Sequence, residues 1–520
     1  MICDILINTG NNITLKPEVE NGNIEYKLRL DHKDEMAMCR IETQLKWRIR
    51  EGKHLCGRYE AVYVFGIMDN GNFPHECENI TEDVIDQSIN IFNLKVERIN
   101  CKILRKEKYI INNKIIGIVK VGIDMDNTDR LTETDILFVG PSGTGKTTLM
   151  SRLTYDQDDN GNGYSRKMSL KHEHEKKQGI TSDIKMDFIG FKGDELVNYF
   201  SGMGSDIEDI YSMSDRYVSL NDLPGDDKYI KTMLYGILSS KGDIIVITVS
   251  SDGTEQCLCD NKRMYQDIVN ICKLTNREPV VLLTRSDLIT GDGEECINTV
   301  IKFFYDLGMS KVNIIKASTI NTDGCDAFIK YICEYSKKSE IAPIDCIINN
   351  DLFITNQMFN IRSGAILYGY VKTGRISIGD IINIFCNGKL IKRSVKSIQK
   401  KMVESKSIEC GETGCIQFHN LRPNIINKTA VVISESLCKF LTDVVVFHPV
   451  NENNIPPKKS YLMFNGSTIQ TVDLYYDEGY KFKSTNKTQL FILPDTVIIL
   501  KDEMHHTYIG KSSPYETVVN

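Results

Sequence analysis

Features that would assign this chain of 520 residues to a membrane-spanning or secreted class are absent from its sequence. No uninterrupted apolar run approaches the roughly 18 residues that a membrane-spanning helix needs. The opening residues, MICDILINTG, turn polar at once, so we expect no secretory signal segment. The 16 cysteines are scattered and lack the paired C-x-x-C spacing of a zinc site, which favours reduced thiols. We therefore expect a cytoplasmic protein that does not bind membranes.

An excess of positive charge is absent as well. The chain carries 63 Lys and Arg against 70 Asp and Glu, a formal net charge of -7, which argues against a protein that coats nucleic acid generally. A local basic face is compatible with this balance, and the candidate segment is KLIKRSVKSIQKKM. Most such runs are solvated strand faces, and RNA contact is the alternative interpretation. The cations of this segment are Lys389, Lys392, Arg393, Lys396, Lys400 and Lys401.

The length predicts about three to four domains, because single hydrophobic cores stop growing well below this size. Residues 1–130 predict a small α+β domain, with strands at CKIL and IIGIVKVGI and a helix that opens at Asn79 or Thr81. Apolar residues recur along this helix at steps of four, three and four, which places them on one face. These residues are Ile85, Ile89, Phe92 and Val96.

The rest of the chain divides into two regions of different periodicity. Residues 131–340 alternate strand and helix in the way that builds a mainly parallel sheet. From Ile341 onward the helical periodicity disappears, and short β runs such as GAILYGYVK, IINIFC and TVIIL alternate with Gly, Asn and Pro turns. This pattern predicts two successive β-barrels, over residues 341–435 and 436–520.

The most informative motif is GPSGTGKTT, which meets every position of G-x-x-x-x-G-K-[ST]. It follows an apolar run at residues 136–139 that predicts a buried strand, and it precedes LMSRL, which predicts a helix. Its glycines allow backbone amides to wrap phosphates at a helix N-terminus, where the helix dipole favours negative charge. Lys146 would reach the β- and γ-phosphates, and the Thr147 hydroxyl would ligate Mg²⁺. The predicted phosphate-binding residues are Gly140, Pro141, Ser142, Gly143, Thr144, Gly145, Lys146, Thr147 and Thr148.

DLPG, at the end of a second predicted strand, supplies a carboxylate and a glycine. In a phosphate-loop GTPase this aspartate, here Asp222, holds Mg²⁺ through water, and the glycine offers its N–H to the γ-phosphate. Thr181, in KKQGITSD, is a candidate switch residue whose hydroxyl would meet Mg²⁺ when the γ-phosphate is present. The nucleotide-binding residues predicted from DLPG are Asp222, Leu223, Pro224 and Gly225. The predicted metal ligands are Thr147, Thr181 and Asp222.

TRSD, residues 284–287, ends a third apolar run. We expect this motif to select guanine over adenine. A carboxylate at Asp287 can accept hydrogen bonds from guanine N1–H and from the exocyclic amine, which adenine cannot supply. A polar site that the wrong base leaves unpaired can discriminate by roughly 10⁴ to 10⁵. A phosphate-loop ATPase or small-molecule kinase is a distant alternative, which TRSD and the predicted barrels count against. The residues predicted to contact guanosine are Thr284, Arg285, Ser286, Asp287 and, through its loop, Ser318.

This order of motifs, followed by two barrels, resembles translation factors of the elongation factor Tu and 1-alpha class. The segment DNGNGYSRKMSLKHEHEKKQGITSD, residues 159–183, looks like the switch I region of the GTP-binding protein 1 and 2 family, with its D-N-G-x-G, H-x-H-E and G-x-T-S elements. DLPGDDKYIKTMLYGI and TRSDL are similar to the third nucleotide motif and the guanine motif of that family. The resemblance covers nearly the whole chain and is weakest before Leu131. It implies GTP binding, GTP hydrolysis and a role near ribosomes, tRNA or RNA turnover.

The chain departs from the family pattern at positions that matter for catalysis. The relatives place His directly after D-x-x-G, where it orients the attacking water, and here that position is Asp226. Two like charges about 4 Å apart cost roughly 1 kcal/mol in water and about four times that at a surface-like effective dielectric. Gly143 stands where the family usually has Asp, so any cation or water contact of that Asp is missing. Arg285 replaces the usual Lys over guanine, which should be nearly neutral because a guanidinium stacks at least as well. The predicted catalytic residues are Asp226 and Thr181.

Two functional interpretations follow. The first is a translation-factor-like GTPase whose nucleotide state sets its affinity for a ribosome, tRNA or RNA partner. The second is a GTP-binding scaffold with little or no hydrolysis, because Asp226 replaces the water-positioning His. In both cases we expect GTP or GDP with Mg²⁺, a monomeric chain, and an activating or exchange factor as a candidate partner. The expected fold class is an α/β phosphate-loop G domain with an N-terminal α+β domain and two C-terminal β-barrel domains.

Overall fold

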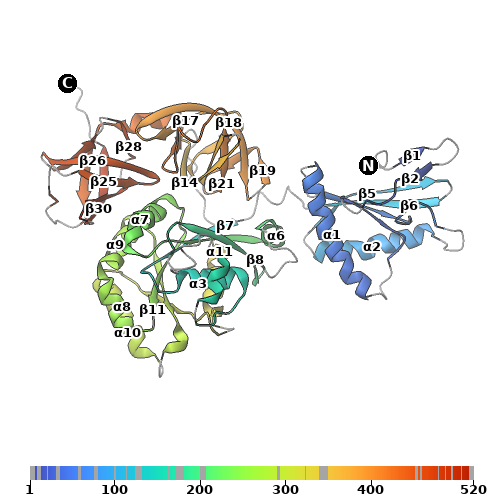
Figure 1. Cartoon of the computed structure of the whole chain (residues 1–520), viewed down its shortest axis with the longest axis horizontal. Coiled ribbons are helices and arrows are strands. Elements are labelled where there is room, and N and C mark those ends of the chain that lie inside the picture. Colours follow the sequence, from blue (N-terminus) through green and yellow to red (C-terminus); the bar gives the residue numbers. More distant parts are fainter. Residues whose placement is uncertain are drawn as a thin grey trace. The chain divides into compact units, whose positions relative to one another are not determined.

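The computed structural model consists of two compact units, Met1–Leu131 and Thr132–Asn520 (Figure 1). Among the residues that it describes, no helix is both long enough and apolar enough to cross a membrane. The structure describes residues 6–8, 13–19, 22–30, 35–56, 60–74, 80–98, 101–112, 114–122, 132–161, 163–169, 181–199, 207–289, 293–321, 324–338, 350–362, 364–401, 403–450, 455–456, 460–477, 479–485, 488–493, 496–504 and 506–514.

The first unit is a four-stranded sheet with two helices packed on one face. In spatial order the strands are β3 (Ile24–Lys27), β4 (Glu60–Phe65), β6 (Lys114–Gly122) and β5 (Lys102–Ile111). β3 runs parallel to β4, and β6 is antiparallel to both of its neighbours. The helices are α1 (Glu35–Cys56) and α2 (Glu82–Arg98). A separate antiparallel pair is formed by β1 (Leu6–Asn8) and β2 (Ile13–Leu15).

The predicted apolar stripe of α2 is confirmed, because all four of its residues are buried against the sheet. Phe92 lies 4.4 Å from Tyr63 and 5.4 Å from Phe65 between ring centroids. The long helix α1 had no predicted counterpart. It buries Ile41, Leu45 and other apolar residues in the same cluster.

The second unit begins with a seven-stranded sheet whose order brings the nucleotide motifs together. In spatial order the strands are β13 (Asn313–Lys316), β12 (Pro279–Thr284), β11 (Ile244–Ser250), β7 (Thr132–Val139), β10 (Arg216–Asp222), β8 (Lys185–Lys192) and β9 (Glu195–Val197). The first five run parallel, whereas β8 and β9 are added in antiparallel pairs. The carboxyl ends of parallel strands lie at one edge of a sheet, so the loops after β7, β10, β12 and β13 share that edge.

Helices cover both faces of this sheet, and successive strand residues alternate between two apolar cores. Leu137 packs toward α7 (Ile230–Ser239), α8 (Thr254–Asp260), α9 (Lys262–Leu274) and α10 (Glu294–Asp306), whereas Phe138 packs toward α3 (Lys146–Tyr155) and α11 (Asp326–Lys338). Burial on both faces explains why these strands read as continuous apolar runs. The shorter helical elements are α4 (Tyr164–Ser169), α6 (Ile207–Met213), η4 (Asp227–Tyr229) and η5 (Ser286–Leu288).

Two closed six-stranded barrels follow, as expected for the fold class, which is confirmed. In barrel II the ring order is β17 (Ile381–Cys386), β22 (Val431–Ile433), β14 (Leu352–Ile361), β15 (Gly364–Thr373), β21 (Thr413–Phe418) and β18 (Lys389–Lys400). The long strand β18 closes this ring, because its first half pairs with β17 and its second half with β21. In barrel III the ring order is β24 (Val444–Pro449), β27 (Tyr480–Ser484), β26 (Thr468–Tyr476), β25 (Ser460–Asn465), β29 (Val497–Lys501) and β30 (Thr507–Pro514).

Short elements complete the two barrels. They are the paired strands β16 (Arg375–Ser377) and β20 (Ser407–Glu409), β19 (Val403–Ser405) beside β18, the paired strands β23 (Leu441–Thr442) and β28 (Leu490–Phe491), and η7 (Glu435–Phe440).

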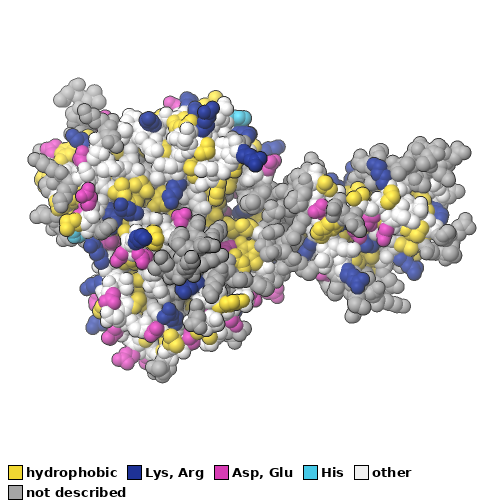
Figure 2. All heavy atoms as spheres, viewed as in Figure 1, with side chains coloured by type: hydrophobic (Ala, Val, Ile, Leu, Met, Phe, Trp, Pro, Cys, Tyr) yellow, Lys and Arg dark blue, Asp and Glu magenta, His cyan; other side chains and the backbone are white. Residues whose placement is uncertain are grey.

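The basic segment predicted as a candidate RNA face lies mainly on β18, with Lys401 just beyond the strand, and part of its charge is engaged within the protein. The Lys392 ammonium lies 3.1 Å from a carboxylate oxygen of Glu435, and that of Lys400 lies 3.1 Å from Glu412. Lys401 lies over the Tyr211 ring, 5.5 Å from its centroid. Positive and negative side chains are interspersed on the face shown in Figure 2. These contacts favour the interpretation of this segment as a solvated strand face.

Candidate functional site

The phosphate loop connects β7 to α3 in a conformation that depends on glycine. Gly140, Gly143 and Gly145 have φ angles of 137°, 83° and 86°, which L-residues rarely adopt. A Cβ on Gly140 would lie 2.8 Å from the carbonyl oxygen of Thr248, so a larger residue would clash with the backbone of β11. Gly145 precedes α3 and offers no side-chain cap, which leaves the first amides of the helix available to an anion.

Lys146 is buried at the start of α3 with its ammonium inside the loop. Its Nζ donates to the carbonyl oxygens of Gly140 and Pro141, at 2.8 and 2.9 Å. A Cβ on Gly225 would lie 2.5 Å from this Nζ, so the DLPG glycine approaches Lys146 as closely as a glycine can. Burial lowers the pKa of Lys146 to about 8, while the Asp222 carboxylate acts in the opposite direction.

The three residues predicted to hold a metal lie in contact with one another. The Thr147 and Thr181 hydroxyls are 2.8 Å apart, and both donate to Oδ2 of Asp222, at 2.5 and 3.2 Å. Asp222 is fully buried, and its Oδ1 has no hydrogen-bond partner in the described part of the chain. Burial raises the pKa of this carboxyl, and Lys146 and the two hydroxyls oppose the rise. Two hydroxyls and a carboxylate with an unpartnered oxygen form the hard oxygen ligand set that suits Mg²⁺.

Asp226, the residue in the position of the expected histidine, caps the turn that follows DLPG. It is the N-cap of η4, and its Oδ1 accepts a hydrogen bond from the backbone N–H of Lys228 at 2.9 Å. This is the ordinary role of an aspartate at the start of a helical turn. It gives the carboxylate a fixed orientation that is independent of any ligand.

TRSD and the loop after β13 meet at the other end of the site. The Ser318 hydroxyl donates to Oδ1 of Asp287 at 2.5 Å, and Ser318 itself is buried. Thr284 ties this motif to the phosphate loop, because its hydroxyl donates to the carbonyl oxygen of Thr144 at 2.7 Å. Arg285 is exposed, and one of its terminal nitrogens lies 3.2 Å from the carbonyl oxygen of Gly143.

These groups border one cleft of about 610 Å³. The predicted residues that line it are Ser142, Gly143, Gly145, Lys146, Thr147, Thr148, Thr181, Gly225, Thr284, Arg285 and Asp287. The predicted residues that lie outside its lining are Gly140, Pro141, Thr144, Asp222, Leu223, Pro224, Asp226, Ser286 and Ser318. Some of these residues pack beneath the residues that line the cleft. Leu223, for example, buries its side chain in the apolar core with α7.

The turn that begins at Asp159 also lines this cleft, although no site residue is predicted in it from the sequence. The Asp159 carboxylate accepts hydrogen bonds from the backbone N–H groups of Gly163 and Ser165, at 3.0 and 2.9 Å, and so organises D-N-G-x-G. The Asp159 N–H donates to the carbonyl oxygen of Thr319 at 2.7 Å, which fixes the turn beside the loop after β13. Arg166, on α4, lines the cleft with this turn. The spacing of the two glycines in D-N-G-x-G is the sequence signal that could have identified this turn as part of the site. Residues 170–180, which hold the H-x-H-E element, lie outside the described residues.

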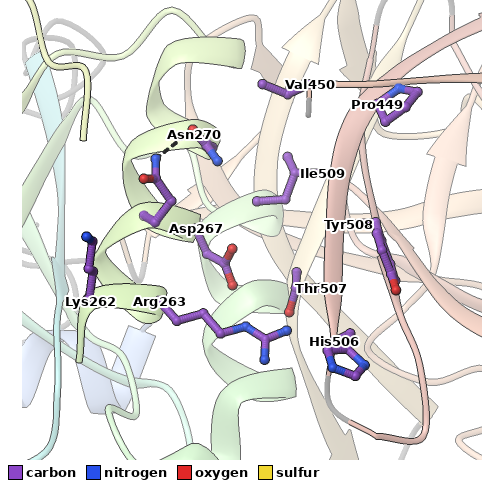
Figure 3. Close-up of a pocket in the computed structure, with 11 residues that line it drawn as sticks. Lys262, Arg263, Asp267, Asn270, Pro449, Val450, His506, Thr507, Tyr508 and Ile509 are labelled. Atoms are coloured by element: carbon purple, nitrogen blue, oxygen red, sulfur yellow. Dashed lines mark hydrogen bonds between the residues drawn. The ribbon is translucent and has the colours of Figure 1, made fainter. Parts of the chain in front are cut away.

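A second cleft, of about 600 Å³, separates α9 from barrel III (Figure 3). Asp267 on α9 points toward Thr507 of β30, and Arg263 extends along the same gap toward His506. Burial raises the pKa of Asp267 to about 6, against the opposing effect of Arg263 and Lys501. Its lining residues come from α9 and barrel III, and among the described residues none of them is a predicted nucleotide-binding residue.

The lowered pKa of Lys146 predicts a pH-dependent affinity for nucleotide. A bound polyphosphate places negative charge beside the ammonium and raises its pKa, so above pH 8 the bound state holds more protons than the free state. Binding is then coupled to proton uptake, and affinity is expected to fall by up to about tenfold per pH unit above about pH 8.

Calorimetry of GDP binding in two buffers of different ionisation enthalpy checks this expectation, because it counts the protons taken up. The pH range stays below that at which guanine loses its own N1 proton. Equal affinity at about pH 7 and about pH 8.8, with no proton uptake, would contradict the lowered pKa.

A phosphate-loop domain followed by two closed barrels has the architecture of a translation-factor-like GTPase. Residues 133–338 match the family model described as elongation factor Tu GTP binding domain, so this part of the chain is a GTP-binding domain of that type.

The resemblance to the GTP-binding protein 1 and 2 family is confirmed. The chain is 33% identical to GTP-binding protein 2 of Mus musculus over 245 residues, which cover 46% of this chain and 38% of the relative. It is 23% identical to GTP-binding protein 1 of Xenopus laevis over 469 residues, 83% of this chain and 68% of the relative. The match therefore spans less than half the length of GTP-binding protein 2.

Solved structures show the same fold. A bacterial selenocysteine-specific elongation factor, EF-Sec, superposes with a TM-score of 0.56 at 18% identity, covering 75% of this chain and 60% of that one. The GTPase-like domain of S. cerevisiae Ski7, bound to GTP, gives a TM-score of 0.57 at 14% identity, with 75% and 100% covered.

Proposed function

We propose that this protein hydrolyses GTP and that its nucleotide state sets its affinity for a ribosome, tRNA or RNA partner. The observation that carries the proposal is the convergence of Thr147, Thr181 and Asp222 beside the phosphate loop. Thr181 belongs to the predicted switch segment, so a residue that senses the γ-phosphate would already be in place. The elongation factor relatives support the choice of partner class.

In this mechanism Lys146 and the loop amides hold the phosphates, and Asp287 selects guanine. Thr147, Thr181 and Asp222 would hold Mg²⁺, which neutralises charge that develops on the phosphates during transfer. The close approach of Gly225 to Lys146 would make the backbone of DLPG sensitive to what occupies the space beside that ammonium.

The element that follows DLPG connects the nucleotide cleft to barrel II. The Tyr235 hydroxyl, on α7, lies 2.6 Å from the carbonyl oxygen of Lys428 and 3.0 Å from that of Asn356. The Asn356 amide donates to the Ser240 hydroxyl at 2.6 Å, just beyond the end of α7. A displacement of α7 would therefore move the backbone of barrel II with it. These contacts support a switch in which nucleotide state sets the orientation of the barrels.

The second candidate function is a GTP-binding scaffold with little or no hydrolysis. It is favoured by one observation, the use of the Asp226 carboxylate as an N-cap. A carboxylate fixed on the Lys228 amide is poorly placed to orient water, and its negative charge opposes that of a triphosphate.

Single-turnover GTP hydrolysis, with and without ribosomes carrying tRNA, distinguishes the two candidates. If the proposal is correct, wild-type protein hydrolyses GTP and ribosomes accelerate the reaction. Asp226→His should raise the rate by about tenfold or more, because imidazole can orient water without adding negative charge. Asp226→Asn keeps the cap but removes the charge, so it should raise the rate less than Asp226→His and measures the effect of charge alone. Asp227→His, one residue away in the same turn, is the matched control and should change the rate little.

Absence of turnover in wild-type protein under both conditions would support the scaffold. A lower rate for Asp226→His than for wild type would instead identify Asp226 as the group that positions the water.

A further inference from the structure

A cavity of about 400 Å³ lies where the G domain and both barrels meet. Its wall comes from the ends of α7 and α9, from barrel II and from barrel III. Among the described residues, none that lines this cavity also lines the nucleotide cleft, so the two are separate. Its volume lies in the range of pockets that hold small molecules.

Two cations line this cavity, and its lining contains no carboxylate among the described residues. Arg277, just beyond α9, donates to the carbonyl oxygens of Ile237 and Ser240 at 3.1 and 3.3 Å. These bonds fix the guanidinium at the C-terminus of α7, where the helix dipole favours a cation. Three of its five N–H groups are not used by them.

Lys372, on β15, is the second cation. Among the described residues its ammonium has no structural hydrogen bond comparable to those of Arg277. Neighbouring protein atoms that displace water, and the charge of Arg277, both lower the pKa of Lys372, although the residue is exposed to solvent. Neither cation forms an ion pair with a carboxylate of the described part of the chain. The two cations line one cavity, and solvent screens their mutual repulsion because Lys372 is exposed; an anion between them would interact favourably with both.

A third donor lies beside these cations. Tyr370, two residues before Lys372 on β15, also lines the cavity. Its hydroxyl makes no hydrogen bond to another described residue. Arg277, Lys372 and Tyr370 all line this one cavity.

The remaining lining is mainly aliphatic and aromatic. Leu238 of α7, Ile354 of barrel II and Val497 of barrel III are examples. A fully hydrated inorganic ion would gain nothing from these surfaces, whereas an anion with an apolar body would bury it against them.

We propose that this cavity binds a small organic acid, whose anionic head meets Arg277, Lys372 and Tyr370 and whose apolar body packs on the side chains of all three domains. Because its walls come from three domains, the ligand stabilises their present arrangement, and affinity for it is linked to whatever moves the barrels. The site is independent of the proposed GTP hydrolysis.

Calorimetric titration of the full chain, loaded with GDP, tests the site with naphthalene-2-sulfonate as the probe. We expect one sulfonate per chain, and binding at least about tenfold weaker for the neutral naphthalene-2-sulfonamide, which has the same apolar body. Lys372→Ala should weaken sulfonate binding by about tenfold, and Tyr370→Phe by a smaller factor. Lys406→Ala, which removes another exposed lysine of barrel II, is the control and should leave binding within about twofold.

Three results would overturn the proposal. The first is the absence of sulfonate binding to wild-type protein. The second is equal binding to wild type and Lys372→Ala, which would place the probe elsewhere. The third is displacement of the sulfonate by a 5′-phosphorylated RNA dinucleotide that binds more tightly than any aromatic or aliphatic acid, which would assign the cations to nucleic acid. GDP affinity, measured in the same samples, reports separately on the nucleotide site.

Discussion

Replacing Asp287 with asparagine is expected to lower the affinity for GTP by about a thousandfold and to favour xanthosine triphosphate in its place. The carboxylate at this position already accepts the Ser318 hydroxyl through Oδ1. In the wild-type protein its acceptor sites would serve the N1–H and the amine of guanine. Adenine offers neither donor in that arrangement.

The buried Ser318 hydroxyl should also fix the orientation of the new amide. It donates to an oxygen, so the amide oxygen of the variant stays near Ser318 and the NH₂ group turns toward the C2 substituent of the base. Guanine presents an amine there, which places donor against donor. Xanthine presents a carbonyl oxygen, which the amide can satisfy. The loss of GTP affinity and the gain of xanthosine triphosphate affinity therefore have one cause.

Competition among GTP, xanthosine triphosphate and ATP for the purified variant measures the change in selectivity. Asp306→Asn, the same substitution at an exposed position on α10, is the matched control and should keep wild-type selectivity. Ser318→Ala should give an intermediate effect, since it removes the group that orients the side chain. An Asp287→Asn variant that keeps the GTP-over-ATP preference of the wild type would refute the assignment of the base site.

Replacing Lys146 with alanine is expected to lower affinity for both GTP and GDP by about three orders of magnitude. The ammonium is buried within the loop, where a charge pair interacts far more strongly than in water. The substitution also exposes the carbonyl oxygens of Gly140 and Pro141, which the ammonium covers, toward the phosphates. The lost attraction to the phosphates and the added repulsion from these carbonyl oxygens both lower the affinity for nucleotide.

Nucleotide dissociation constants from a fluorescent GDP analogue test this expectation, with Lys302→Ala on the exposed face of α10 as the control for a lost positive charge. Thermal unfolding of the nucleotide-free proteins shows whether the variant is folded. A folded Lys146→Ala protein that binds GDP within about tenfold of wild type would remove Lys146 from the phosphate site.

Much of the fold could be predicted because its signals are local. Strands buried on both faces, such as β7 and β12, read as apolar runs, and the polar motifs begin where those runs end. The stripe of α2 was visible because its residues lie on one face at helical spacing. Helix α1 was not predicted, because its buried positions, such as Ile41 and Leu45, form only a narrow stripe. The neighbouring Trp47 is partly exposed, so the apolar face is hard to recognise from the sequence.

Parts of the site depended on contacts that no local pattern encodes. The D-N-G-x-G segment was visible as a motif, but its place in the cleft comes from the hydrogen bond between Asp159 and the distant Thr319. The cavity with Arg277 and Lys372 is formed by three domains, so neither residue carries a local signal.

The sequence by itself predicted a phosphate loop, a candidate guanine motif and two barrels, because each depends on residues that are close together in the chain. Only the tertiary structure decided how their side chains pair. It brings Thr181 to Thr147 and leaves one oxygen of Asp222 without a hydrogen-bond partner among the described residues. The physical reason is that loops from distant strands share one sheet edge, and a side chain's partner is set by which loops meet there.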